Sequence, residues 1–239
     1  MSKPYQDKFH IEGGEIIRQI VFGMNDGIVS VFALLAGVFG GGLGTREILI
    51  TLLAATVAGA LSMAAGEFIS AKSERNYFEN EINQERLEVK LIPEVEKEEI
   101  RLIYKNKGFS GDLLNQIVKK ITSNPELWVK EMVIDELGIA EIEQKGELKG
   151  TIFIFISFIL GALFPVLPYI IFQFLPPGYE LMIFLIAAIE TFAGLFLVGA
   201  LKKFITGVNW VKSGMEMLLV GTLAFIASFF IWGLIESLV

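Results

Sequence analysis

The chain has 239 residues, of which 53% are hydrophobic, and it carries a net charge of −7. The hydrophobic residues gather in long blocks, a pattern typical of membrane spans rather than of one large soluble core. The absence of cysteine and the single histidine exclude disulfides, thiolate metal sites and Cys/His nucleophilic pairs, and the negative charge argues against nucleic acid as a partner.

Five stretches are apolar enough and long enough to cross about 30 Å of hydrocarbon as helices. They are residues 16–41, 47–71, 150–174, 179–201 and 213–236. The second is rich in Ala, Gly and Ser, which let helix backbones approach closely, so we expect it to pack against protein. The sequence predicts an all-α polytopic membrane protein with five transmembrane helices and a helical insert between spans two and three. The expected divisions are 1–72, 73–148 and 149–239.

The first two spans carry polar side chains at membrane depth. Asp26 lies in span one with apolar runs on both sides, and a buried aspartate there costs about 2.5–3.5 kcal/mol on insertion scales, which marks it as a functional candidate. Met63 and Glu67 lie four residues apart on one face of span two. A thioether and a carboxylate together suit a borderline transition metal. The alternatives are an interfacial position for Asp26 and core packing for Met63.

The insert reads as a series of helices. Residues 73–91 continue from span two with no Gly or Pro, so we expect one long helix that projects from the membrane. Pro93 then begins a second helix at its tolerated first turn, and Gly108 ends it. Ser110 and Asp112 begin a third helix that runs to residue 121, and residues 123–125 begin a fourth that reaches residue 137.

Four glutamates of the insert have no Lys or Arg three or four residues away, and apolar residues flank them. They form two pairs at helical spacing, Glu85 with Glu88 and Glu96 with Glu99. Like charges at this spacing are unfavourable, and more so when partly buried.

A divalent cation held between two helices would offset that repulsion, as in bundles whose helices share carboxylate ligands. Met132 and Glu136 lie four apart on the fourth insert helix and add a thioether and a further carboxylate. The alternative is a solvated acidic face whose basic partners come from another helix.

Basic residues in short loops predict the orientation, because they favour the cytoplasmic side. Lys and Arg are concentrated before span one and between spans four and five, whereas the loop between spans three and four has none. We therefore expect the N-terminus and the insert in the cytoplasm and the C-terminus outside.

Two of these stretches resemble a known family. Residues 25–30, Asn-Asp-Gly-Ile-Val-Ser, and residues 62–70, Ser-Met-Ala-Ala-Gly-Glu-Phe-Ile-Ser, look like the vacuolar iron transporter family, and so does the Glu-rich insert. The resemblance covers essentially the whole chain and is to the branch with a cytoplasmic metal-binding domain. One difference is Val133, which follows Met132 where the family often has a second methionine. It bears on the sulfur content of the site and on the preference for iron.

The resemblance implies a homodimer in the lipid bilayer that exports Fe²⁺ from the cytosol by proton antiport, with Mn²⁺ and other divalent transition metals as alternative cargo. It implies no organic cofactor. The membrane would be the cell membrane in a prokaryote and the vacuolar membrane in a plant or fungus. Asp26 and Met63 match the family's translocation path, to which we add Glu67. The matching insert positions are Glu85, Glu88, Glu96, Glu99, Met132 and Glu136.

Two other functions remain open from the residues. A membrane-anchored metal sensor or ferroxidase would use the spans only as an anchor, although carboxylate di-iron sites normally include histidines. A Mg²⁺ or Ca²⁺ transporter would use oxygen ligands alone, and Met63 and Met132 would then be incidental. The leading prediction is a secondary transporter, not an enzyme.

Overall fold

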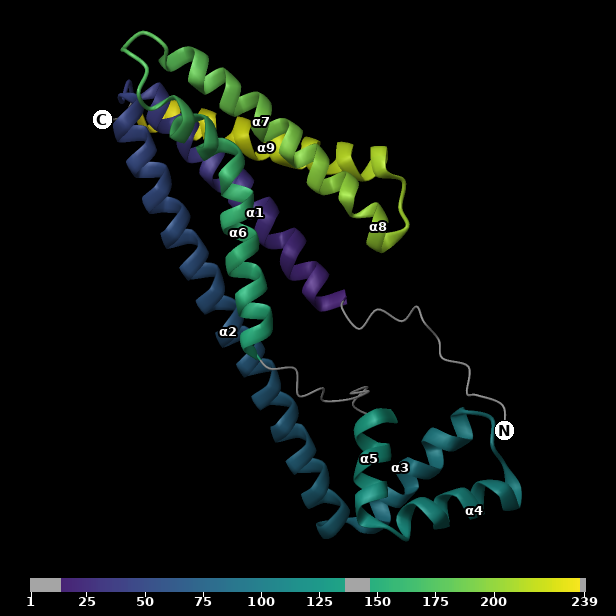
Figure 1. Cartoon of the computed structure of the whole chain (residues 1–239). Coiled ribbons are helices and arrows are strands. Elements are labelled where there is room, and N and C mark those ends of the chain that lie inside the picture. Colours follow the sequence, from purple (N-terminus) through teal and green to yellow (C-terminus); the bar gives the residue numbers. More distant parts are fainter. Residues whose placement is uncertain (1–13, 136–146, 237–239) are drawn as a thin grey trace, which may run out of the picture. The chain divides into compact units, whose positions relative to one another are not determined.

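The computed structural model describes residues 14–135 and 147–236. Within these ranges every regular element is a helix, and five helices are long and apolar enough to cross a membrane (Figure 1). The predicted all-α fold with five spans is therefore confirmed. The chain divides into two compact units, one formed by residues 1–68 with 147–239 and the other by residues 69–146.

The first unit contains the candidate spans. They are α1 (Gly14–Gly40), the first part of α2 (Thr45–Leu91), α6 (Glu147–Phe172), α7 (Glu180–Leu201) and α9 (Trp210–Glu236). Each begins or ends within about three residues of its prediction, apart from α2. A four-residue helix that the sequence did not predict, α8 (Lys203–Thr206), follows α7. Gly207 caps its end with a φ of +69°, which favours glycine.

Glycines let α1 and α6 pack closely. A Cβ on Gly27 would come 2.1 Å from the Phe158 carbonyl oxygen, and a Cβ on Gly161 would come 2.2 Å from the Met24 carbonyl oxygen. Small residues at helix contacts are the usual means of close approach in lipid, where helices gain little from burying apolar surface against each other. The buried core of this unit includes Leu35 on α1, Leu52 on α2 and Tyr169 on α6, and its members come from four helices.

The helix α2 runs without interruption for 47 residues, and the division between the two units falls within it. This continuity agrees with the prediction from the absence of Gly and Pro after residue 66. On α2 the face with Leu53, Val57 and Leu61 is exposed in the single chain, so the expected packing of this span against protein is only partly met within one subunit.

The second unit consists of the end of α2 with α3 (Pro93–Asn106), α4 (Gly111–Thr122) and α5 (Pro125–Asp135). Its hydrophobic core includes Val89, Ile100, Val118 and Trp128, so all four helices contribute to it. The Asn124 side chain accepts hydrogen bonds from the first backbone N–H groups of α5 and so caps that helix. The predicted end of the fourth insert helix, at residue 137, lies outside the described residues.

Polar contacts at one end of α3 connect it to α5. The Tyr104 hydroxyl donates a 2.7 Å hydrogen bond to Glu131, and Lys107 forms an ion pair with Asp135. Desolvation, and then the hydrogen bond and negative charge of Glu131, raise the pKa of Tyr104 to about 12. These contacts fix the C-terminal end of α3, and the glutamates of the predicted metal site lie at the other end.

Candidate metal centre

The predicted site forms where α2 ends and α3 begins. Pro93 has no backbone N–H, and its ring restricts the residue before it, so α2 stops at Leu91 and α3 starts at Pro93 itself. Ile92 between the two helices has non-helical angles of φ −131° and ψ 49°, while its carbonyl accepts hydrogen bonds from the amides of Val95 and Glu96. The chain therefore turns over a single residue, and the last turns of α2 face the first turns of α3.

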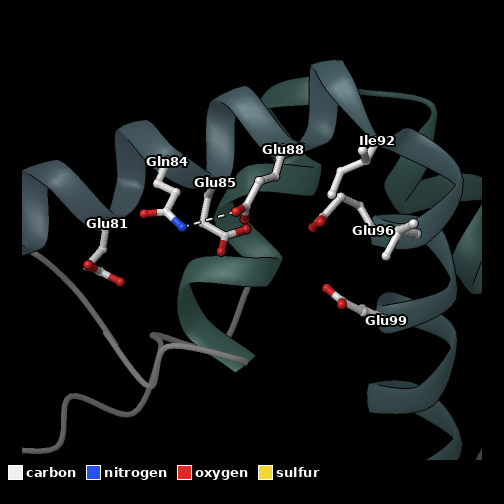
Figure 2. Close-up of a pocket in the computed structure, with 8 residues that line it drawn as sticks. Glu81, Gln84, Glu85, Glu88, Ile92, Glu96 and Glu99 are labelled. Atoms are coloured by element: carbon white, nitrogen blue, oxygen red, sulfur yellow. Dashed lines mark hydrogen bonds between the residues drawn. The ribbon is translucent and has the colours of Figure 1, made fainter.

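A pocket of about 320 Å³ lies in the angle of this turn, and glutamates line both of its sides (Figure 2). The α2 side carries Glu85 and Glu88, and the α3 side carries Glu96 and Glu99. The four glutamates that the sequence singled out thus line one pocket, which helical spacing alone did not require for residues on two different helices.

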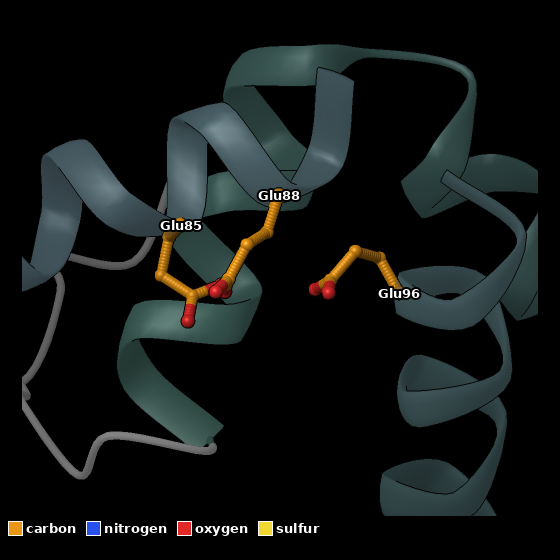
Figure 3. A group of neighbouring side chains, drawn as sticks. All are labelled: Glu85, Glu88 and Glu96. Carbon is orange, nitrogen blue, oxygen red and sulfur yellow. The ribbon is translucent and has the colours of Figure 1, made fainter. Parts of the chain in front are cut away.

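Three of these glutamates are close enough to share one ion. One carboxylate oxygen from each of Glu85, Glu88 and Glu96 lies within 4.8 Å of the others (Figure 3). Oxygen ligands bind Mg²⁺ or Ca²⁺ at about 2.0–2.6 Å, so two ligands of one ion are at most about 4.0–5.2 Å apart. The spacing of the three oxygens is therefore compatible with ligands of a single divalent cation.

The electrostatics of this group favour a cation. Glu85 is 5% exposed and Glu96 is 3% exposed, and Glu88 is half-buried. Placing carboxylates close together away from water is unfavourable, because their charges repel and lose hydration. A divalent ion between the two helices would supply the opposite charge and would join α2 to α3.

Two polar residues that line the pocket, Glu81 and Gln84, were not predicted as part of the site. Gln84 donates a 3.0 Å hydrogen bond to Glu88 and so orients that carboxylate, and Glu81 lies further along the same side of the pocket. Each precedes a predicted ligand by four residues, which places it on the same helix face. That spacing is the signal in the sequence that could have found them.

The other three predicted ligands of the insert are not part of this group of three glutamates. Glu99 lines the pocket but is not one of the three glutamates within ligand distance of one another. Met132 is fully buried in the hydrophobic core of the insert, among residues such as Ile100 and Trp128, and is not one of the residues that line the pocket. Glu136 lies outside the described residues. A ligand role for all three stays a prediction.

The predicted path residues lie on two helices of the first unit. Asp26 is half-buried on α1, and Met63 on α2 packs against the buried core. Glu67, one turn after Met63, accepts a hydrogen bond from Gln19 of α1. These residues are not part of the glutamate group, and their role in transport stays a prediction.

Comparison with known proteins identifies the family. The model described as the VIT family matches residues 17–232, which is most of the chain. The chain belongs to the VIT family. This membership confirms the resemblance seen in the two membrane stretches.

Named VIT-family relatives align over nearly the full length of the chain. Vacuolar iron transporter 1 of Arabidopsis thaliana is 31% identical over 220 residues, which cover 92% of this chain and 86% of the relative. Vacuolar iron transporter 1 of Tulipa gesneriana is 32% identical over 92% of this chain and 87% of its own length. The vacuolar iron transporter of Plasmodium falciparum is 30% identical over 87% of this chain and 78% of its own length. All three relatives are named as transporters.

Proposed function

We propose that this VIT-family protein is a secondary transporter that moves Fe²⁺ out of the cytosol. The observation that carries the proposal is the convergence of Glu85, Glu88 and Glu96 in a protein with five candidate spans. The names of the relatives support iron as the cargo, with Mn²⁺ and other divalent transition metals as alternatives. The insert collects the ion, and Asp26, Met63 and Glu67 pass it through the membrane.

The distribution of basic residues favours a cytoplasmic N-terminus and insert and an external C-terminus. Because the insert collects the ion on the cytoplasmic side, the direction of transport is out of the cytosol. Proton antiport is chemically reasonable, because carboxylates that release a metal can take up protons. The membrane is the vacuolar one if the protein comes from a plant or fungus, and the cell membrane if it comes from a prokaryote.

A homodimer is the proposed assembly. Ala54, Ala58, Ser62 and Gly66 follow one another at intervals of four along α2, and all four are exposed in the single chain. Small residues at this spacing let two transmembrane helices approach closely. A second subunit against this face would also meet the expectation that span two packs against protein.

A Mg²⁺ or Ca²⁺ transporter is the second candidate, and one observation favours it. The residues that line the pocket offer oxygen ligands, whereas the sulfur of Met132 belongs to a side chain in the hydrophobic core. Hard ions prefer such an all-oxygen site. The identity of the ion is therefore the first property to measure.

The proposal is tested by metal uptake into liposomes that contain the full-length protein and a pH-sensitive dye. We expect Fe²⁺, kept reduced, to enter together with a pH change of the lumen. Asp26→Ala should abolish uptake, and Glu85→Ala/Glu88→Ala should reduce it at low metal concentration. Glu79→Ala/Glu98→Ala is the matched control, because it removes the same charge from exposed glutamates that pair with Arg75 and Arg101.

Four outcomes separate the alternatives. Full uptake by Asp26→Ala would contradict the assigned path. No uptake of any ion by the native chain would contradict transport and favour a sensor. Mg²⁺ or Ca²⁺ that outcompetes Fe²⁺ would favour the second candidate, and metal uptake without a pH change would exclude proton antiport.

A further inference from the structure

A buried amide lies against one of the predicted path residues. Gln19 on α1 is 4% exposed, and its Nε2 donates a hydrogen bond of 2.5 Å to Oε1 of Glu67 on α2. The Oε1 atom of Gln19 is also buried, and no donor in the described part of the chain forms a hydrogen bond with it. Burying an amide oxygen without a partner is unfavourable, so this arrangement satisfies only one side of the amide.

The helix α6 also contacts this amide, in addition to α1 and α2. A Cβ on Gly150 would lie 2.2 Å from Nε2 and 2.9 Å from Oε1 of Gln19, so the amide rests directly against the α6 backbone at a position without a side chain. Residues of three helices of the first unit thus meet at the Gln19 amide, and the Glu67 side chain beside it is half-buried. Both residues have oxygen atoms of the kind that divalent cations bind.

A half-turn of the terminal amide exchanges Nε2 and Oε1 without moving the rest of the side chain. Oε1 then faces the Glu67 carboxylate. A cation binds both oxygens once the half-buried Glu67 side chain moves back from 2.5 Å to the separation of about 2.8–4.2 Å that two oxygen ligands of one ion require. In the hydrogen-bonded arrangement, Nε2 instead holds the carboxylate in place. The pair therefore has one arrangement suited to the empty state and another suited to a bound cation.

We propose that Gln19 and Glu67 form a subsite for the divalent cation within the spans, with Gln19 as an additional ligand through Oε1. This proposal rests on the proposed transport function. Gln19 lies 21 residues before the end of α1 at Gly40, and Glu67 lies 22 residues after the start of α2 at Thr45, so they share one depth. In the proposed orientation that depth is near the cytoplasmic side, where the ion enters the membrane helices.

Binding of Co²⁺ to the full-length protein in detergent tests the subsite without transport. Co²⁺ has the charge of Fe²⁺ and similar ligand preferences, and it resists oxidation by air. The triple change Glu85→Ala/Glu88→Ala/Glu96→Ala removes the insert ligands, and calorimetry then measures the remaining binding. We expect Gln19→Leu, which keeps the size but has no oxygen, to weaken this binding roughly tenfold or more.

Thr191→Val is the control, because Thr191 is fully buried on α7 and its hydroxyl donates a hydrogen bond to the Ala187 carbonyl of its own helix. It should leave Co²⁺ binding unchanged. Equal Co²⁺ binding by the triple variant with Gln19 and with Leu at position 19 would overturn the subsite, as would a triple variant that binds no Co²⁺.

Gln19→Glu separates a cation site from an interhelical hydrogen bond. Two carboxylates at this distance repel each other, so the variant should melt at a lower temperature than the native chain in chelator. Co²⁺ should restore its melting temperature and raise it by more than it raises that of the native chain. A melting temperature that Co²⁺ does not restore would overturn the proposal, because it would show only a lost hydrogen bond.

The failure of the subsite and the failure of transport are distinguishable. Uptake by the native chain together with unchanged Co²⁺ binding in Gln19→Leu would overturn the subsite and leave transport in place. The absence of uptake together with weakened binding in Gln19→Leu would support the subsite and contradict transport.

Discussion

The substitution Glu96→Gln should change the stability of the insert in opposite directions with and without a divalent ion. Gln has nearly the same shape as Glu but carries no charge. Glu96 is 3% exposed, and an oxygen of its carboxylate lies within 4.8 Å of those of Glu85 and Glu88. At an effective dielectric constant of about 20, two unit charges at that distance repel each other by about 3 kcal/mol.

Glu96 has two such neighbours, and water at the half-buried Glu88 screens part of the repulsion. In chelator we therefore expect Glu96→Gln to raise the free energy of unfolding of the insert by about 1–3 kcal/mol. With a bound ion, the native chain becomes more stable than Glu96→Gln. An ion that binds only the folded insert stabilises it by about 2.7 kcal/mol at 100 times its Kd, and the variant loses most of this because one of three carboxylates is gone.

Trp128 provides the measurement, since it is buried in the hydrophobic core of the insert. Trp210→Phe and Trp232→Phe, made in every variant, leave Trp128 as the single tryptophan of the chain. Denaturant unfolding of the full-length protein in detergent is then followed by fluorescence, once in chelator and once in saturating Mn²⁺.

Glu98→Gln is the control, because Glu98 is exposed and pairs with Arg101 at 3.1 Å on the surface of α3. Its effect should be small and the same in both conditions. The reasoning is refuted if Glu96→Gln is less stable than the native chain in chelator, or if its effect has the same sign and size with Mn²⁺.

Two further predictions concern packing and pH. The pKa of Tyr104 is raised from its usual value of 10 to about 12. The protonated Tyr104 side chain therefore stabilises the folded insert fully below pH 10, and this stabilisation is lost as the pH rises to about 12. Unfolding of the insert, followed by fluorescence, should show that its free energy of unfolding falls over this pH range. Tyr104→Phe should make that fall smaller. An equal fall in Tyr104→Phe and in the native chain would contradict the role of the hydrogen bond to Glu131. In the spans, Gly27→Ala should lower the free energy of unfolding in detergent by about 1–3 kcal/mol, because its methyl group meets the Phe158 carbonyl. An unchanged free energy of unfolding in Gly27→Ala would contradict the packing argument.

The local features of the fold were predictable because they depend on neighbours along the chain. The absence of Gly and Pro after residue 66 predicts the uninterrupted α2, and Pro93 predicts the break that follows. The spacing of Glu85 with Glu88, and of Glu96 with Glu99, places each pair on one face of its own helix. The apolar blocks likewise predict five helices of spanning length.

Other features were not predictable, because they depend on how helices meet. The single-residue turn at Ile92 brings Glu96 within ligand distance of the α2 glutamates, whereas Glu99, on the same face of α3, only lines the pocket. Met132 was predicted as a ligand from its spacing to Glu136, yet its side chain is in the hydrophobic core of the insert. A methionine at helical spacing serves a core and a metal site equally well, so the sequence does not distinguish the two.

The helices, their breaks and the carboxylates on each helix face thus follow from neighbouring residues, because backbone sterics and the helical repeat act over a few positions. Which faces meet depends instead on how the helices pack. Gln19 shows this most clearly, because it is an ordinary polar residue near the start of α1 until packing against Gly150 and Glu67 buries its amide. Gln19 and Glu67 are 48 residues apart on two different helices, so helical periodicity does not relate them and their contact follows from helix packing alone.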